Sequence, residues 1–393
     1  MTRAMIERAR GVLLLVTLAM LGACDGKRAS EEVPPAAEQP QVVEAVDPQA
    51  AESLSRAVWE AGLAQVTDVQ AAIEALNRAL AGLLDKPSED HLEAAKLAWL
   101  DAHREFAAAL PYIRLAFAPA PLREQGRELL LTVDSWPAQP GYLDTVPGYS
   151  DSGIVNDTAV ELTLANLRRQ HRLTAHEEAS TGFHALEVML WGPTSERVAD
   201  DFIAVSTGEK PEALATNRRR QLTRLMGEAL GEDFNRLAKR LAYGANDLSQ
   251  PFLALEPVAR LQQIRAIHTQ VIDEELLRRL PESSESDVES SRAADSKQAI
   301  LATLRTLQAN WLPASGAGLA ELLLDRNQQQ ALAEHFVALE ELLLGMEDPV
   351  ELAELDQLAR GRQLMEALAG LMSGTVDVPA ADEDMTPVSL QGQ

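Results

Sequence analysis

The chain has 393 residues, with 60 acidic against 35 basic side chains and a formal net charge of −25 at pH 7. This excess of negative charge excludes binding to nucleic acid through a phosphate-contacting surface and opposes adhesion to anionic lipid headgroups. Apolar residues make up 46% of the chain but aromatic residues only 4%, which favours helices over a β-sandwich.

The first 24 residues have the pattern of a bacterial lipoprotein signal. Three arginines within the first ten residues flank the start of an apolar run over residues 11–21. This run is too short to span a bilayer as a mature helix. Leu21-Gly22-Ala23-Cys24 resembles a lipobox, in which the cysteine is lipidated. We predict a signal peptide over residues 1–23 and lipidation of Cys24. The alternative is an ordinary signal peptide with a chance cysteine.

The flanks of the chain indicate where the protein resides. Cys24 is the only cysteine, so no disulfide can form within the chain. Asp25 after a lipidated cysteine resembles the signal that retains Gram-negative lipoproteins in the inner membrane. We expect the protein to face the periplasm, attached to the membrane through the lipid on Cys24. Residues 24–50 are predicted to be a flexible linker and residues 373–393 a disordered tail.

Between these ends, apolar residues recur at helical spacing. One long helix is predicted over residues 51–84, and Ser88 or Asp90 can cap the next helix. That helix is predicted over residues 91–110, where Pro111 interrupts the pattern and leaves a continuation to residue 117 open. Further helices are predicted over residues 123–131, 158–173, 182–191, 217–243, 258–280, 293–312, 319–324, 329–344 and 349–372.

No strand is predicted, so the expected fold class is all-α. Two runs of long helices, separated by a loop over residues 244–257, suit two helical-bundle domains over residues 51–243 and 244–372. A long loop rich in aromatic residues, proline and glycine is predicted over residues 135–157. Long structured loops in compact domains are often functional.

The segment from Gly182 to Gly192 places His184 and Glu187 three residues apart in an otherwise apolar run. Positions i and i+3 of a helix share a face, so both side chains point to the same place. Burying such a pair costs free energy unless hydrogen bonds, a neighbouring charge or a metal ion satisfies it. The pair is a candidate for metal binding. The alternative is a structural pair that holds the helices to the loop at residues 136–144.

This Gly-x-His-x-x-Glu segment resembles the signature of the imelysin family, also called the M75 peptidase-like family. Weaker matches to the family pattern occur in the same order along residues 54–372. These matches are Trp99 with Ala102, Arg104 and Phe106; Ser135-Trp136-Pro137 with Leu143-Asp144; Arg218-Arg219; and Glu282-Ser283, Ser286-Asp287 and Asp295. The chain departs from the family pattern at Ala109-Leu110-Pro111, where an acidic residue is usual, and at Glu285, which replaces an aromatic residue.

The resemblance implies an all-helical protein of the periplasm or cell surface, with two bundle-like domains. It implies a site near their junction, built around His184 and Glu187. Members of the family are linked to iron acquisition, to metal binding and to peptide cleavage.

Two ligands on one helix face hold a metal only weakly, so other segments must supply more. The predicted metal ligands are His184, Glu187 and Asp144. A further ligand is expected from Asp101, His103 or Glu105. Mixed imidazole and carboxylate ligation suits iron, with zinc as the second candidate, and no thiolate is available.

Trp136, Arg104 and Arg218 are the predicted ligand-binding residues. Arg218 opens a run of three arginines that could meet an anionic ligand such as a chelated metal. The alternative for Arg218 is a solvated helix start, and the alternative for Trp136 is a ring that clamps the loop to the bundle.

We therefore expect a lipid-anchored protein that binds a metal ion, iron first, or an iron-bearing ligand, and passes it to iron-uptake membrane proteins. One alternative is a metal-dependent peptidase of the M75 type. The chain has no His-Glu-x-x-His motif, because the run from His176 to Ser180 lacks the second histidine. The other alternative is a non-catalytic envelope adaptor that binds a protein partner and no metal.

Overall fold

The computed structural model describes residues 46–242, 248–283 and 288–374. Across these ranges the regular secondary structure is helical, and no strand occurs apart from a single bridge between Val146 and Tyr149. The all-α fold class is confirmed. Within the same ranges, no helix combines the length and apolarity that a bilayer span requires. The predicted signal peptide, Cys24 and residues 375–393 of the predicted tail lie outside the described residues.

The α-helices succeed one another along the chain with short turns of other helix types between them. They are α1 (Pro48–Asp85), α2 (Glu89–Ala116), α3 (Arg123–Val133), α4 (Pro140–Leu143), α5 (Leu164–Gln170), α6 (Phe183–Trp191), α7 (Ala215–Leu241), α8 (Ser249–Leu253), α9 (Pro257–Val271), α10 (Leu277–Arg279), α11 (Ser296–Trp311), α12 (Leu319–Leu323), α13 (Arg326–Gly345) and α14 (Leu355–Ser373). One π-helical turn, η4 (Ile272–Leu276), joins α9 to α10.

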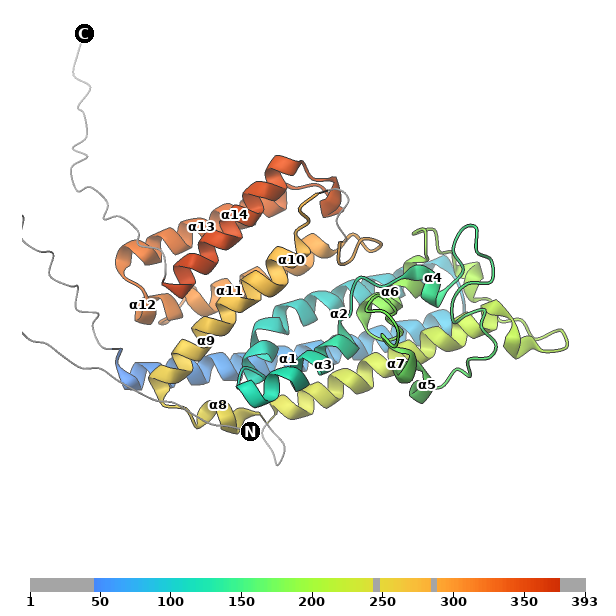
Figure 1. Cartoon of the computed structure of the whole chain (residues 1–393), viewed down its shortest axis with the longest axis horizontal. Coiled ribbons are helices and arrows are strands. Elements are labelled where there is room, and N and C mark those ends of the chain that lie inside the picture. The colour runs from blue at the N-terminus through green and yellow to red at the C-terminus, as the bar shows by residue number, and fades with distance from the viewer. Residues whose placement is uncertain (1–45, 243–247, 284–287, 375–393) are drawn as a thin grey trace, which may run out of the picture. The chain divides into compact units, whose positions relative to one another are not determined.

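Three long helices, α1, α2 and α7, form the framework of the fold (Figure 1). Helix α1 packs along α2 and α7, because its apolar positions recur every three or four residues and are buried, as at Ile73, Leu76 and Leu80. Helix α6 contacts both α2 and α7. Helix α2 also contacts α9 and α11, so the two predicted domains share an extensive contact. Their division into two domains stays a prediction.

Helix α2 runs through Pro111 to Ala116 without a break. Proline has no N–H, so the carbonyl group of Ala107, four residues earlier, loses its helical donor. The hydroxyl group of Thr303 on α11 donates to that carbonyl at 2.8 Å. The neighbouring helix thus replaces the missing hydrogen bond, which the sequence pattern of α2 alone could not reveal.

Helix α5 covers Leu164–Gln170, and the prediction of a helix over residues 158–173 was wrong at both ends. The guanidinium group of Arg218 on α7 donates to four backbone carbonyls just before α5, at 2.7–2.9 Å. These carbonyls belong to Ile154, Val155, Asp157 and Val160. A segment whose carbonyls converge on one side chain cannot run as a regular helix, because helical carbonyls point along the helix axis.

The remaining predicted helices are present, with small differences. The predicted loops contain the additional short helices α4 and α8. The last helix begins at Leu355 rather than at residue 349, because Val350–Leu352 forms a separate 3₁₀ turn. Of the two predicted caps, Ser88 is the one that caps α2, since its side chain accepts a hydrogen bond from the backbone N–H of His91.

Thr303→Val should lower the free energy of unfolding by about 1–3 kcal/mol, because it leaves the buried Ala107 carbonyl without a donor. Thr223→Val is the matched control. The hydroxyl group of Thr223 is equally buried, but it donates only to Arg219 of its own helix, so its loss should cost less than about 1 kcal/mol. Urea unfolding measures both values. Equal costs would contradict the role assigned to Thr303.

Candidate metal centre

Four side chains from four segments converge at one point among the helices. His103 lies on α2, Asp134 at the end of α3, His184 on α6 and Glu289 in the turn before α11. One donor atom from each side chain lies within 4.8 Å of the other three. The two imidazole rings and Glu289 are buried, and the Asp134 carboxylate is nearly so. We call this set the metal centre.

The glycine of the signature brings two of these segments together. Gly182 has a φ of +92°, a backbone conformation that favours glycine. A Cβ atom at this position would lie 2.6 Å from the carbonyl oxygen of Val133. Only glycine therefore lets the start of α6 lie against the end of α3. As a result, Nε2 of His184 lies 2.8 Å from Oδ1 of Asp134.

A carboxylate fixes the orientation of each imidazole ring. Nδ1 of His184 lies 3.1 Å from Oε2 of Glu187, and Nδ1 of His103 lies 3.1 Å from Oδ2 of Asp295. When Nδ1–H donates to a carboxylate, Nε2 is left to coordinate a metal ion. Both Nε2 atoms face Oε1 of Glu289, at 3.6 Å and 3.7 Å. The same carboxylate–histidine pair thus occurs twice around one centre.

Arg279 of α10 contacts both carboxylates of the centre. Its Nη2 lies 3.1 Å from Oδ2 of Asp134, and its Nε lies 2.8 Å from Oε1 of Glu289. Within the described residues, Oε2 of Glu289 has no partner, and Nε2 of His103 makes no hydrogen bond either. Buried polar atoms without partners cost free energy. A cation bound between these atoms would remove that cost.

The charges around the centre do not balance when both imidazole rings are neutral. Four carboxylates face two guanidinium groups and leave a net charge of −2. The carboxylates are those of Asp134, Glu187, Glu289 and Asp295, and the guanidinium groups are those of Arg104 and Arg279. One divalent cation, or one proton on each imidazole ring, neutralises this charge.

Without a metal ion, the surrounding carboxylates favour protonation of both imidazole rings. Burial opposes a charged ring at His103, but Asp295 and Glu289 beside it raise its pKa to about 9. Burial also opposes charge at His184, yet Asp134 and Glu187 raise its pKa well above the ordinary value. Burial would raise the pKa of Glu289, but Arg279 and the two imidazole rings hold it well below its usual range. A divalent cation would replace the two imidazole protons.

The donor set fits a divalent transition metal. In a tetrahedral site with ligand distances of about 2.0–2.2 Å, the ligand atoms lie roughly 3.4 Å apart. The separations from His184 Nε2 to Asp134 and Glu289 and from His103 Nε2 to Glu289 are 2.8, 3.7 and 3.6 Å. Two imidazole nitrogens with two carboxylate oxygens suit Fe(II) or Zn(II).

Comparison with known proteins agrees with the signature and the fold. The sequence profile of the imelysin family, Peptidase_M75, matches residues 62–375. The chain belongs to the imelysin family.

Two solved structures share this imelysin fold. An imelysin-like protein from Psychrobacter arcticum is 15% identical, with a TM-score of 0.55 over 84% of this chain and 96% of that chain. A protein from Parabacteroides distasonis, described as a putative iron-regulated protein A precursor, is 12% identical, with a TM-score of 0.56 over 85% of this chain and 96% of that chain. No curated protein matches the chain.

Of the three predicted metal ligands, the structure brings His184 into the metal centre and gives Glu187 a different position. Oε1 of Glu187 accepts the backbone N–H groups of Arg292 and Ala293 at 3.0 Å and 2.9 Å, and its other oxygen faces His184. Glu187 therefore ties the turn that carries Glu289 to the signature helix and orients His184. Its oxygens are not among the four donors of the centre.

Asp144 also lies outside the four donors. Its oxygens accept hydrogen bonds from Arg219 at 2.7 Å and 2.9 Å and from Arg197 at 2.6 Å. Burial would raise the pKa of Asp144, but these two guanidinium groups lower it. This ion pair attaches the predicted loop over residues 135–157 to α7. Of the three candidates on α2, His103 joins the centre.

The predicted ligand-binding residues lie in three different places. Arg104 pairs with Asp295 beside the centre. Arg218 binds the backbone carbonyls that precede α5. Trp136 lines a cleft, where the guanidinium carbon of Arg278 lies 4.0 Å from the centre of its ring.

Sequence reasoning missed Asp134 and Glu289 as donors and Arg279 as their partner. Asp134 directly precedes the Ser135-Trp136-Pro137 piece, so its position beside a matched motif was an available signal. Glu289 lies in a run rich in serine and glutamate. That composition is typical of a solvated loop and gave no signal.

Glu187→Gln should lower the metal affinity of the centre by about 10- to 100-fold, a usual cost of losing a carboxylate behind a histidine ligand. Glutamine can still accept the backbone N–H groups of Arg292 and Ala293 through Oε1. Its NH₂ group then faces Nδ1 of His184, so that ring must carry its proton on Nε2, where it blocks a metal. Calorimetric titration with Zn(II) measures the loss.

Asp144→Asn is the matched control, since it also weakens a buried ion pair but lies outside the four donors. It should lower the melting temperature and leave the metal affinity unchanged. A loss of affinity in Asp144→Asn equal to that in Glu187→Gln would contradict the roles assigned to both residues.

Proposed function

We propose that this imelysin-family protein binds one divalent transition-metal ion, iron first, at its metal centre and passes it to a membrane uptake system. The observation that carries the proposal is the convergence of two imidazole rings, each oriented by a carboxylate, on Asp134 and Glu289. The oriented rings, the two oxygen ligands and the net negative charge are what a divalent cation requires.

Iron is favoured by the donor set and by one structural neighbour. Nitrogen and oxygen donors without a thiolate suit Fe(II). The protein from Parabacteroides distasonis is described as iron-regulated. Affinity in solution does not identify the metal, because Zn(II) binds most such sites more tightly than Fe(II) and occupancy in the cell depends on availability. The identity of the metal must be read from protein isolated from cells.

Titration of the purified protein with Fe(II) without oxygen, and with Zn(II), should show one saturable site. His184→Ala and Glu289→Ala should each weaken binding by about 100-fold or more, because each removes a ligand and leaves buried charge unbalanced. Elemental analysis of protein isolated from iron-fed and zinc-fed cells reports which metal the centre carries.

His268→Gln is the control for loss of a buried imidazole ring. His268 lies on α9, where its Nδ1 accepts a hydrogen bond from Trp311 at 3.1 Å, and it is not a donor of the centre. The variant should be less stable but bind metal as the wild type does. Wild-type protein that binds no metal but captures a protein partner would support the adaptor. Metal-dependent peptide cleavage lost in Glu187→Ala would support the peptidase.

We further propose that the protein is attached to the periplasmic side of the inner membrane through lipid on Cys24. The lipobox-like segment from Leu21 to Cys24 and Asp25 support this placement. Labelled palmitate should be incorporated by the wild type and not by Cys24→Ser, which should fractionate with soluble periplasmic proteins. Asp25→Ser should redirect the lipoprotein to the outer membrane. Palmitate on Cys24→Ser would overturn the assignment.

A further inference from the structure

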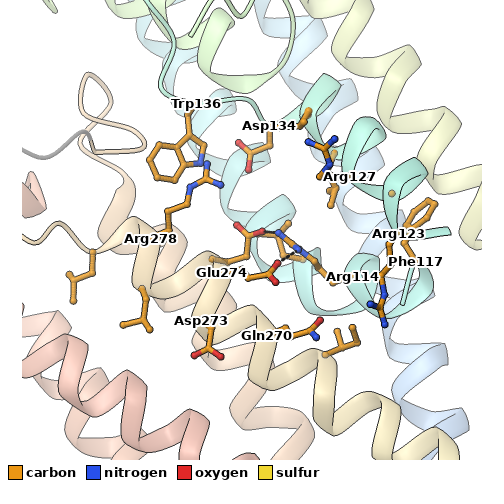
Figure 2. A pocket seen from close by; sticks show the side chains of 18 of the residues that line it. Arg114, Phe117, Arg123, Arg127, Asp134, Trp136, Gln270, Asp273, Glu274 and Arg278 are labelled. Atoms are coloured by element: carbon orange, nitrogen blue, oxygen red, sulfur yellow. Dashed lines mark hydrogen bonds and ion pairs between the residues drawn. The ribbon is translucent and has the colours of Figure 1, made fainter. Parts of the chain in front are cut away.

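A cleft with a cavity volume of about 1160 Å³ lies beside the metal centre (Figure 2). Its walls come from the end of α2, from α3, from the loop at Trp136, from the segment after α5 that carries Arg172, from the stretch between α9 and α10, and from Arg362 of α14. Of the four donors of the centre, Asp134 alone lies on its wall. Small-molecule sites usually have volumes of about 300–1,000 Å³, so the cleft has room for a whole organic ligand next to the centre.

The cleft is lined by six arginine side chains in a strongly acidic chain. They are Arg114, Arg123, Arg127, Arg172, Arg278 and Arg362. Arg114, Arg127 and Arg362 form ion pairs with glutamate side chains. Among the described residues, no carboxylate pairs with the other three. Nε of Arg123 donates to the carbonyl of Ala118 at 3.0 Å, and Nε of Arg172 is buried without a partner.

The carboxylates of the cleft are mostly paired already. Glu274 and Glu275 pair with Arg114, Glu282 pairs with Arg362, and Asp134 pairs with Arg279. Asp273 is the remaining carboxylate on the wall. Figure 2 shows Asp273 near Gln270, away from Trp136. The described lining thus holds six guanidinium groups against five carboxylates, and three of these guanidinium groups have no carboxylate partner among the described residues.

Arg278 is positioned and oriented to bind an anion. Its guanidinium carbon lies 4.0 Å from the centre of the Trp136 ring, and Figure 2 shows the two side chains together on one side of the cleft. The ring fixes the plane of the guanidinium group, and in the described part of the chain its N–H donors bind no other side chain. Arg278 is exposed, but partial desolvation by the cleft walls, together with the charge of Arg279, lowers its pKa. A bound anion would offset both effects.

We infer that this cleft binds a small organic polycarboxylate, free or as the chelating ligand of the metal ion, with Arg278 and Arg172 holding its carboxylates. A guanidinium group matches the two oxygens of a carboxylate. A polycarboxylate also has further oxygens that can stay on a metal ion beside Asp134. The chelate form of the ligand rests on the proposed function, whereas binding of the free anion does not.

Calorimetric titration with citrate tests this inference, with full-length protein that is either metal-free or loaded with Zn(II). Citrate should bind saturably, and more weakly as NaCl is raised. Arg278→Gln and Arg172→Gln should each weaken binding about tenfold, since each removes a charge-assisted hydrogen bond. Arg278→Lys keeps the positive charge but loses the paired N–H donors of the guanidinium group, so it should also bind citrate more weakly. This variant replaces Arg278→Gln as the test if Arg278→Gln does not fold.

Arg127→Gln is the matched control, because Arg127 lies on the same cleft but already pairs with Glu124 and Glu128. It should bind citrate as the wild type does. The inference is overturned if citrate binds neither form, if Arg278→Gln and Arg172→Gln keep wild-type affinity, or if inorganic phosphate binds equally well. Titration with metal alone decides the proposed function separately. Citrate binding that depends on Arg278 in protein that binds no metal would refute that function and leave the anion site standing.

Discussion

The buried ion pairs of Arg279 are the interaction on which this part of the structure depends. One guanidinium group contacts Asp134 at the end of α3, Glu275 in the turn η4, and Glu289 before α11. Removing one partner from a buried pair of this kind typically costs about 3–5 kcal/mol, because it leaves a charge uncompensated. The segments therefore cannot separate without leaving a buried charge unpaired or exposing it to solvent. This requirement holds three distant parts of the chain at one point, against the imidazole rings of His103 and His184.

The π-helical turn η4 explains how one short stretch contributes side chains to both the metal centre and the cleft. A π-turn widens the helix by one residue and rotates the residues after it, and such turns are frequent at functional sites. Here Glu274 and Glu275 both reach Arg114, while Glu275 also reaches Arg279. The side chains of the next residues lie in different places: Arg279 contacts Asp134 of the metal centre, and Arg278 lies on the cleft beside Trp136. Adjacent residues of α10 thus connect the cleft to the centre.

The sequence predicted what depends on local pattern and missed what depends on distant contacts. Helix α1 is predicted by the spacing of its apolar residues, and the pairing of His184 with Glu187 by their separation of three positions. The continuity of α2 through Pro111 depends on Thr303, and the shortening of α5 depends on Arg218. Neither effect leaves a trace in the local pattern.

The same reason explains the incomplete prediction of the metal ligands. Asp134 directly precedes the aromatic loop and Asp144 lies within it, and either could have met His184 on sequence grounds alone. The choice is made by Gly182, which brings the end of α3 against α6, and by Arg219, which already binds Asp144. A glycine with positive φ at a close backbone approach is a three-dimensional constraint, so it can be understood only once both segments are placed.

The signs of charge in the cleft and in the metal centre bear on which form of metal can reach the centre. The chain as a whole is acidic, and the centre is negative when its imidazole rings are neutral. A bare cation would therefore be attracted to the centre but repelled by Arg278 and Arg172, which have no carboxylate partner among the described residues. A chelate with excess carboxylates is attracted by the same guanidinium groups and brings its metal ion next to Asp134. If the cleft binds a chelate as proposed, its guanidinium groups would favour chelated metal over the bare cation, and Glu289 with the two imidazole rings would hold the metal ion once it is released.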